Sequence, residues 1–217
     1  MTLDLFHAVA DGSAAEVELA PGARLLRRFA APLAPDAAAT LASIVATAPL
    51  RHMRTPGGRA LSAAMTNCGR LGWISDARGY RYEPTDPLTG LPWPALPTPW
   101  LDLAHAAAAC AGFPGFTPDA CLINRYAPGA GMTLHQDRNE RDLSAPVVSI
   151  SLGLPAVFLL GGILRGDRAQ RIRVAHGDVV VWGGPARLRF HGVAPIAAGD
   201  HAAVGPWRYN LTLRAAG

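Results

Sequence analysis

Two histidines and one aspartate stand in the order of a metal site. His135 and Asp137 are separated by one residue, and His191 follows far along the chain. Residues i and i+2 of a β-strand point to the same face, so His135 and Asp137 can face one metal ion while a distant antiparallel strand supplies His191. Two imidazoles and one carboxylate are the facial ligand set of non-heme Fe(II) oxygenases, which leaves coordination positions open.

A His-x-Asp pattern alone is weak evidence, because a chain with seven histidines and sixteen acidic residues contains one by chance fairly often. A surface turn with solvated polar groups is the alternative. The last apolar run, residues 207–213, adds to the metal interpretation because side chains alternate along a strand. One face would carry Arg208, Asn210, Thr212 and Arg214. Two arginines on one face indicate either an exposed edge or the lining of an anion pocket, and we favour the pocket.

Longer motifs occur at residues 118–129 (PDACLINRYAPG), 134–137 (LHQD), 149–153 (SISLG), 176–184 (HGDVVVWGG) and 208–212 (RYNLT). Together they resemble the bacterial AlkB family of alkylation-repair dioxygenases. The resemblance covers nearly the whole chain, from Leu3-Asp4-Leu5-Phe6 to the final strand, and includes residues 65–69 and 71–73. That family uses Fe(II), 2-oxoglutarate and O2 to remove small alkyl groups from nucleic-acid bases.

The resemblance implies a role for each candidate residue. His135, Asp137 and His191 would bind Fe(II) and form the catalytic centre. Arg214 would bind the distal carboxylate of 2-oxoglutarate, and Arg208 would lie near its metal-bound end. Further hydrogen bonds to 2-oxoglutarate would come from Asn124, Tyr126 and Asn210. Trp73 would stack on the base, and the remaining candidates for contacts with the substrate are Thr55, Met65, Tyr80, Asn139 and Arg165.

The implied reaction is oxidative demethylation of bases of the 1-methyladenine and 3-methylcytosine type, as in direct-reversal DNA repair. It converts 2-oxoglutarate to succinate and releases formaldehyde. The expected partner is alkylated single-stranded DNA; RNA, and duplex DNA with a flipped base, are further candidates because the base must leave its stack. Two alternatives stay open: a 2-oxoglutarate-dependent hydroxylase of a protein or small molecule, and a non-catalytic metal-binding jelly roll.

Two positions depart from the family pattern. Close relatives have an acidic residue two positions after the metal-binding carboxylate, where this chain has Asn139. They have a lysine in the loop before the metal motif, where this chain has Gly131. The first departure puts the base preference in doubt, and the second removes one expected phosphate contact.

Length and composition agree with a single domain over residues 1–217. The chain is 50% hydrophobic, which is enough for a sizeable core. All 20 basic residues are arginine, and the net charge of +4 makes an anionic partner plausible. The arginines of residues 51–59, 138–141 and 165–173 either contact phosphates around one groove or lie in solvated loops. Neither a membrane span nor a secretory signal is evident, so we expect a cytoplasmic protein. We also expect a monomer.

The order of elements predicts an α+β fold with N-terminal helices and a double-stranded β-helix, or jelly-roll, core. Ala-rich stretches at about 36–46 and 98–112 predict helices, the second with proline at its first position. Short apolar runs from residue 121 onwards, punctuated by Gly and Pro, predict antiparallel strands. The loop-rich segment 51–97 contains several aromatic residues. We expect it to be a nucleotide-recognition lid over the site.

Overall fold

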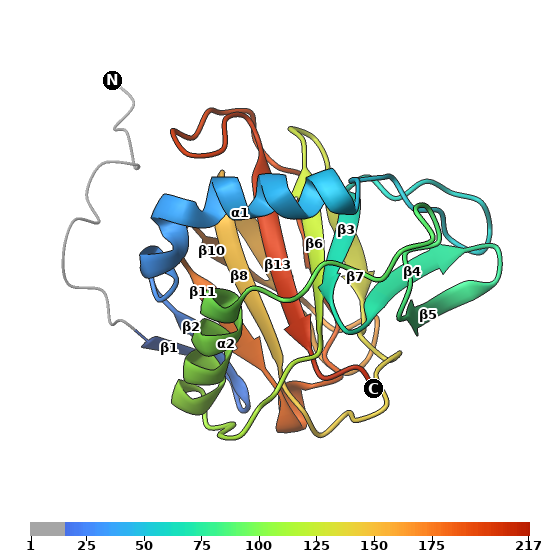
Figure 1. The fold of residues 1–217 in the computed structure, drawn as a ribbon. Helices are drawn as coiled ribbons and strands as arrows, with labels where there is room; N and C mark the ends of the chain where they lie inside the picture. The colour runs from blue at the N-terminus through green and yellow to red at the C-terminus, as the bar shows by residue number, and fades with distance from the viewer. Residues whose placement is uncertain (1–15) are drawn as a thin grey trace.

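The structure, a computed structural model, describes residues 16–217 (Figure 1). The N-terminal motif Leu3-Asp4-Leu5-Phe6 lies outside the described residues. The strands are β1 (Glu16–Ala20), β2 (Ala23–Leu26), β3 (Ala64–Gly69), β4 (Gly72–Asp76), β5 (Gly79–Glu83), β6 (Ala120–Tyr126), β7 (Met132–His135), β8 (Val147–Gly153), β9 (Ala156–Leu160), β10 (Gln170–Val174), β11 (Val179–Trp182), β12 (His191–Val193) and β13 (Arg208–Arg214). The helices are α1 (Ala34–Thr47) and α2 (Thr98–Cys110), with short 3-10 turns at Ala31–Leu33 and Gly184–Ala186.

Two antiparallel sheets form the core. The larger sheet has seven strands in the order β1-β2-β11-β8-β13-β6-β3, and the smaller has four in the order β10-β9-β12-β7. Apolar residues from both sheets pack into one buried cluster, which includes Met65, Phe158, Leu160 and Trp182. A third sheet is the β4–β5 hairpin. The predicted jelly-roll core is therefore confirmed.

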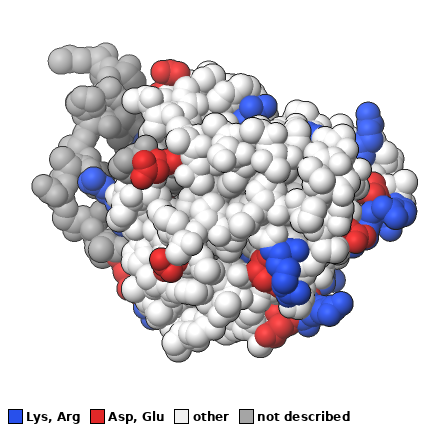
Figure 2. All heavy atoms as spheres, viewed as in Figure 1, with Lys and Arg blue, Asp and Glu red and all other residues white. Residues whose placement is uncertain are grey.

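Both predicted helices are present, and both lie on the outer face of the seven-stranded sheet (Figure 1). Proline stands in the first turn of each, where the missing N–H costs nothing. Their apolar side chains form a second buried cluster with the outward-facing residues of the sheet, including Leu41, Trp100, Ile150 and Leu211. This helix-covered face carries only scattered charged side chains (Figure 2). No helix among residues 16–217 has the length and hydropathy needed to cross a membrane.

The alternation along β13 explains how one strand serves both the core and the site. Leu211 and Leu213 are fully buried in the cluster beneath the helices. Arg208 and Arg214 point to the opposite face, between the two sheets, as the alternating pattern predicts. β13 also lies between β6 and β8, so both of its edges are hydrogen-bonded. The strand that carries the two arginines is thus among the most firmly held in the molecule.

The segment 51–97 contains more regular structure than its sequence predicts. β3 pairs along its whole length with β6 and belongs to the seven-stranded sheet, so Met65 is part of the core wall. Strands β4 and β5 form the separate hairpin, seen at the right of Figure 1. Their many glycine and polar residues give little apolar alternation, which is why the sequence pattern does not reveal these strands.

Candidate active site

A cavity of about 400 Å³ opens between the two sheets and the β4–β5 hairpin. This volume lies within the range of small-molecule sites. The structure brings every candidate residue of the sequence to its wall: Thr55, Met65, Trp73, Tyr80, Asn124, Tyr126, His135, Asp137, Asn139, Arg165, His191, Arg208, Asn210 and Arg214. They come from elements far apart in the chain, so the fold is what assembles them.

The two histidines are direct neighbours on adjacent strands. His135, the last residue of β7, pairs with His191, the first residue of β12. Asp137 lies two residues beyond the end of β7, so the expectation that it shares a strand with His135 is wrong. Its carboxylate nevertheless reaches both imidazoles, with Oδ1 3.8 Å from His135 Nε2 and Oδ2 3.7 Å from His191 Nε2. The three side chains can therefore bind one ion.

Backbone hydrogen bonds prepare both imidazoles for metal binding. His135 Nδ1 lies 2.9 Å from the carbonyl oxygen of Thr133, and His191 Nδ1 lies 3.1 Å from that of Arg189. A carbonyl only accepts, so each Nδ1 must carry the proton and each Nε2 keeps a free lone pair. Since both Nε2 atoms face Asp137, two neutral nitrogens and one carboxylate are presented together. This donor set fits Fe(II).

The protonation states follow from burial and neighbouring charges. Burial lowers the pKa of His191 to about 3, since a buried imidazolium would lose its hydration. Burial alone would raise the pKa of Asp137, but the charge and hydrogen bonds of the Arg214 guanidinium hold it below its usual value. A neutral imidazole beside an ionised carboxylate is the state that binds a divalent cation.

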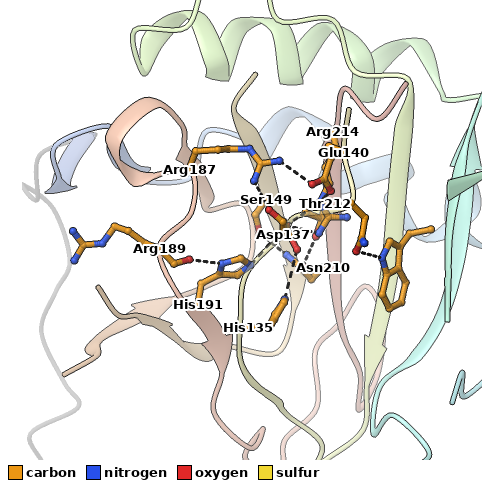
Figure 3. A network of polar contacts seen from close by, with 12 residues as sticks. His135, Asp137, Glu140, Ser149, Arg187, Arg189, His191, Asn210, Thr212 and Arg214 are labelled. Atoms are coloured by element: carbon orange, nitrogen blue, oxygen red, sulfur yellow. Dashed lines mark hydrogen bonds and ion pairs between the residues drawn. The ribbon is translucent and has the colours of Figure 1, made fainter. Parts of the chain in front are cut away.

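Asp137 is also held by a buried network of charged side chains (Figure 3). Arg214 donates to Asp137 Oδ2 from Nε at 2.9 Å and from Nη2 at 2.7 Å, and its Nε lies 3.3 Å from Glu140 Oε1. Arg187 donates to Glu140 Oε2 at 3.0 Å and to the backbone oxygen of Asp137 at 2.9 Å. Burial lowers the pKa of Arg214, but Asp137 and Glu140 outweigh it and raise that pKa above its ordinary value.

Arg208 lies in different surroundings. It is 2% exposed, yet within residues 16–217 it donates only to neutral acceptors, at 3.0 Å to Ser151 Oγ and at 3.3 Å to the carbonyl oxygen of Leu154. Its Nε has no partner among the described residues. Burial lowers the pKa of Arg208 to about 10. A guanidinium does not lose its proton in a protein, so a buried one without a carboxylate fits an anionic ligand.

These surroundings differ from those expected for the two arginines. Arg214, expected at the distal carboxylate of 2-oxoglutarate, is bonded to the metal-binding Asp137. Arg208, expected near the metal, is bonded to Ser151 instead. Both point into the cavity from one face of β13, and residue spacing alone does not say which end of that face lies nearer the metal.

The other candidate residues for binding 2-oxoglutarate differ in whether their polar atoms already have hydrogen-bond partners. Asn124 is buried, and its Oδ1 has no partner within the described residues. Burial raises the pKa of Tyr126 to about 12, which keeps its hydroxyl protonated as a donor. The amide of Asn210 is already occupied, since it donates to Ser149 Oγ at 2.7 Å and accepts from Thr212 Oγ1 at 2.9 Å. Asn124 Oδ1, unpartnered among the described residues, and the Tyr126 side chain both line the cavity where a ligand would bind.

The β4–β5 hairpin forms one rim of the cavity. Trp73 on β4 stacks on Tyr80 of β5, with ring centroids 5.7 Å apart and an interplanar angle of 13°. Asn67 fixes the backbone of Trp73 by two hydrogen bonds of 3.0 Å. Trp73 Nε1 reaches Asn139 Oδ1 at 3.4 Å, and the hydroxyl of Tyr82 donates to Glu140 Oε1 at 2.6 Å. The hairpin is therefore tied to the segment that follows the metal motif.

Sequence reasoning missed Tyr82, Glu140 and Arg187. Glu140 follows Asp137 by three residues, which is a weak signal that the sequence does provide. Arg187 comes directly after a 3-10 turn and has no spacing that relates it to the metal motif. Only the fold shows that its guanidinium bonds the metal segment.

The sequence pattern of the 2OG-Fe(II) oxygenase superfamily matches residues 22–214. The alpha-ketoglutarate-dependent dioxygenase AlkB of Salmonella typhimurium is 54% identical, over 99% of this chain and 98% of its own length. AlkB of Escherichia coli is 53% identical over the same shares. The chain belongs to the AlkB family of dioxygenases. The solved structure of OsALKBH1, 29% identical, superposes with a TM-score of 0.81 over 92% of this chain and 99% of that one.

Family membership makes this protein an Fe(II)- and 2-oxoglutarate-dependent dioxygenase with O2 as co-substrate, as the sequence predicts. The residues present fit both groups. Two imidazoles and a carboxylate suit Fe(II). Two buried guanidinium groups suit a dicarboxylate, because a guanidinium fork matches a carboxylate in charge and shape.

We expect Asp137→Ala to abolish succinate formation and to weaken Co(II) binding, followed by the visible absorption of the bound ion. Losing a ligand should exceed the roughly 10- to 100-fold cost of losing an outer partner of a metal site. Asp142→Ala, which removes an exposed carboxylate from the same loop, is the control. Full turnover by a folded Asp137→Ala protein at ordinary iron concentration would contradict the assignment.

Arg208→Ala should raise the 2-oxoglutarate concentration needed for half-maximal turnover. Loss of a buried charge-assisted pair costs on the order of 2–5 kcal/mol. The measurement is a 2-oxoglutarate titration of succinate formation, with Arg168→Ala, an exposed arginine, as the matched control. An unchanged titration would assign the distal carboxylate to another residue.

Proposed function

We propose that this dioxygenase removes alkyl groups from bases of the 1-methyladenine and 3-methylcytosine type in nucleic acid, with single-stranded DNA as its main substrate. The observation that carries the proposal is the stacked pair Trp73 and Tyr80 on the wall of the cavity that also holds the metal ligands. An aromatic face binds any unstacked base without regard to its sequence. A base resting there would have its alkyl group directed into the cavity.

Different residues of the chain would have different roles in this reaction. Fe(II), 2-oxoglutarate and O2 supply one oxidation of the alkyl carbon, and the hydroxylated group then leaves the base nitrogen as formaldehyde. Arg208, Asn124 and Tyr126 would bind the distal carboxylate of 2-oxoglutarate. Arg214 would hold Asp137 at the metal, and its Nη1, which has no partner among the described residues, would bind the metal-bound end of 2-oxoglutarate. The apolar walls exclude water, which strengthens each of these charged contacts.

Nucleic acid as the substrate class is supported by relatives and by charge. The mouse relative named nucleic acid dioxygenase ALKBH1 is 33% identical over 57% of this chain. Exposed arginines stand beside the cavity mouth, at Arg138 and Arg165, whereas charges are scattered over the helix-covered face. Not every arginine that was expected to contact phosphate is available for it, because Arg51 donates to Asp86 Oδ1 at 2.6 Å.

The alternatives named from the sequence fit less well. A non-catalytic metal site has no use for a second buried guanidinium, Arg208, that has no carboxylate partner among the described residues. A small-molecule hydroxylase has no use for aromatic rings at an open rim. Four expectations from the sequence stay predictions: the segment 51–97 as substrate lid, the single domain over 1–217, the monomeric state and the location in the cytoplasm.

The test is incubation of the purified protein with Fe(II), 2-oxoglutarate and a single-stranded oligonucleotide that carries one 1-methyladenine. Mass spectrometry should detect the demethylated oligonucleotide, with succinate and formaldehyde in equal amounts. Omission of 2-oxoglutarate is the control. Succinate formation without demethylation of any methylated oligonucleotide would agree with a dioxygenase activity but would overturn the proposed substrate.

We expect Trp73→Ala to cost about 1–3 kcal/mol in kcat/KM for the oligonucleotide, the range for loss of a stacking platform. The 2-oxoglutarate requirement should not change. Trp207→Ala is the matched control, because Trp207 packs under Arg125 away from the cavity. If Trp73→Ala lowers only the unfolding temperature and keeps kcat/KM, Trp73 is a packing residue.

Asn139→Asp should favour cationic lesions. Alkylation at N1 of adenine makes the base cationic, and the Asn139 side chain, which lines the cavity beside Trp73, has no charge to match it. Restoring a carboxylate should shift selectivity by about 1 kcal/mol, roughly fivefold, after solvent screening. The measurement compares kcat/KM for oligonucleotides with 1-methyladenine and 1-methylguanine. A ratio that stays within about twofold would mean that position 139 does not read base charge.

A further inference from the structure

A stacked pair of imidazoles lies outside the active-site cavity. His176 is in the β10–β11 turn and His201 is in the β12–β13 connection, and their ring centroids are 4.4 Å apart with an interplanar angle of 26°. Neither residue is part of the cavity wall. The pair therefore holds together two connections that are far apart in the sequence.

Both imidazoles accept a hydrogen bond through Nδ1. The N–H of Gly153 donates to His176 Nδ1 at 2.9 Å, and the N–H of Ala203 donates to His201 Nδ1 at 3.2 Å. A backbone N–H only donates, so each Nδ1 must be unprotonated, and each neutral ring carries its proton on Nε2. This arrangement does not suit a metal ion, because the lone pair of each Nδ1 is already used and each Nε2 is protonated.

The bond from Gly153 connects His176 to the turn that holds Arg208. Gly153 ends β8 with a φ of 83°, a conformation that residues with a side chain rarely adopt. It is also paired with Arg208 across the sheet. The carbonyl oxygen of the next residue, Leu154, accepts from Arg208 Nη1 at 3.3 Å. The imidazole of His176 thus supports the backbone that positions one acceptor of the Arg208 guanidinium.

The β10–β11 turn also holds the other acceptor of Arg208. Ser151 Oγ accepts from Arg208 Nη2 at 3.0 Å. The N–H of Gly177 donates to the carbonyl oxygen of Ser151 at 2.8 Å, and the N–H of Ser151 donates to the carbonyl oxygen of Asp178 at 2.9 Å. Both neutral partners of the guanidinium therefore depend on the turn that carries His176.

The charged groups near the pair do not compensate a protonated imidazole. The carboxylate of Asp178 already accepts from Arg27 at 2.8 Å, and Asp200, beside His201, is exposed to solvent. Arg27 and Arg208 are cations and cannot stabilise another positive charge. Within residues 16–217, histidine–carboxylate ion pairs occur at the metal site and not at this pair.

The neutral form of His176 is the one that the fold favours. Burial lowers the pKa of His176 below its ordinary value, and the neighbouring imidazole of His201 lowers it further. A proton on Nδ1 would turn an acceptor into a donor that faces the N–H of Gly153. The stabilisation from this contact is therefore present above about pH 6.5, the ordinary pKa of histidine, and is lost as the pH falls.

We propose that His176 is a positioning residue for the distal carboxylate of 2-oxoglutarate: its neutral imidazole holds the β8–β9 turn, and this turn holds Arg208. Stacking on His201 keeps the imidazole in the orientation that accepts from Gly153. Protonation of the imidazole releases the turn, so recognition of the distal carboxylate weakens in acid. The inference rests on the part of the proposed function that assigns Arg208 to this carboxylate, and it does not depend on the substrate base.

The test measures two dissociation constants on anaerobic Fe(II)-loaded protein, and the readout is the value for 2-oxobutyrate divided by that for 2-oxoglutarate. The two ligands share the metal-binding end, and 2-oxobutyrate lacks the distal carboxylate. Protonation at the metal site therefore affects both ligands and cancels in the ratio. A glutamate-like carboxyl has a pKa of about 4.3, so the distal carboxylate stays ionised down to about pH 5.5. The wild-type ratio should fall several-fold from about pH 8 to about pH 5.5.

Two variants separate the acceptor from the titration. His176→Phe keeps a ring against His201 but cannot accept from Gly153. Its ratio should be on the order of tenfold below wild type at about pH 8, the usual cost of losing an outer partner of a site, and should not vary with pH. His176→Asn keeps an acceptor oxygen in place of Nδ1 and does not titrate, so it should restore the wild-type ratio and retain it in acid.

The matched control is His52→Asn, which removes an exposed imidazole outside the cavity and should behave as wild type. Thermal unfolding at each pH shows that the variants are folded during the titration. A wild-type ratio that is constant with pH, or a folded His176→Phe protein with the wild-type ratio, would overturn the positioning role. If His176→Phe does not fold, His176→Asn decides, because a ratio that falls in acid as in wild type would also overturn it. A wild-type ratio near one at about pH 8 would overturn the assignment of Arg208 and the inference with it.

Discussion

The buried charges on one wall of the cavity are the constraint on which the rest of the structure depends. Arg187, Arg208 and Arg214 are each at most 5% exposed. Two buried carboxylates, Asp137 and Glu140, pair with Arg187 and Arg214 but not with Arg208. Burying a charge is costly unless it is paired. Arg214 contacts both carboxylates, whereas Arg187 bonds the carboxylate of Glu140 and the backbone oxygen of Asp137. Among the described residues Arg208 has only neutral partners, so we expect an anion to complete its surroundings.

The seven-stranded sheet keeps these charges buried and in place. Along β13, alternate residues enter the apolar cluster under α1 and α2, while the residues between them face the cavity. The same alternation occurs on β8, where Ile150 is in the core and Ser149 and Ser151 bond Asn210 and Arg208. Packing by the helices therefore fixes the polar side chains on the opposite face, which a surface loop could not do as firmly.

Much of this arrangement could be predicted from the sequence. The apolar runs gave β8, β9, β11 and β13, and proline-led Ala-rich stretches gave both helices. The strands in segment 51–97 were missed because β3 contains polar residues, Thr66 and Asn67, that are buried by pairing rather than by hydrophobicity. The family motifs named the candidate residues that line the cavity.

The partners of those residues could not be predicted. The sequence does not show which arginine of β13 lies nearest the metal. That distance depends on where the end of β7 passes over the sheet, which the tertiary structure determines. Glu140 and Arg187 meet only because the 3-10 turn at Gly184–Ala186 returns the chain to the metal segment. Local patterns carry no information on contacts of this kind.

The central claim is that Arg208 needs a distal carboxylate to complete a buried charged wall. Its most direct test is anaerobic titration of the Fe(II)-loaded protein with 2-oxoglutarate and with 2-oxobutyrate, which keeps the metal-binding end and lacks the distal carboxylate. A buried charge-assisted pair predicts that 2-oxoglutarate binds tighter by about 2–5 kcal/mol. Equal affinity for the two ligands would contradict the account.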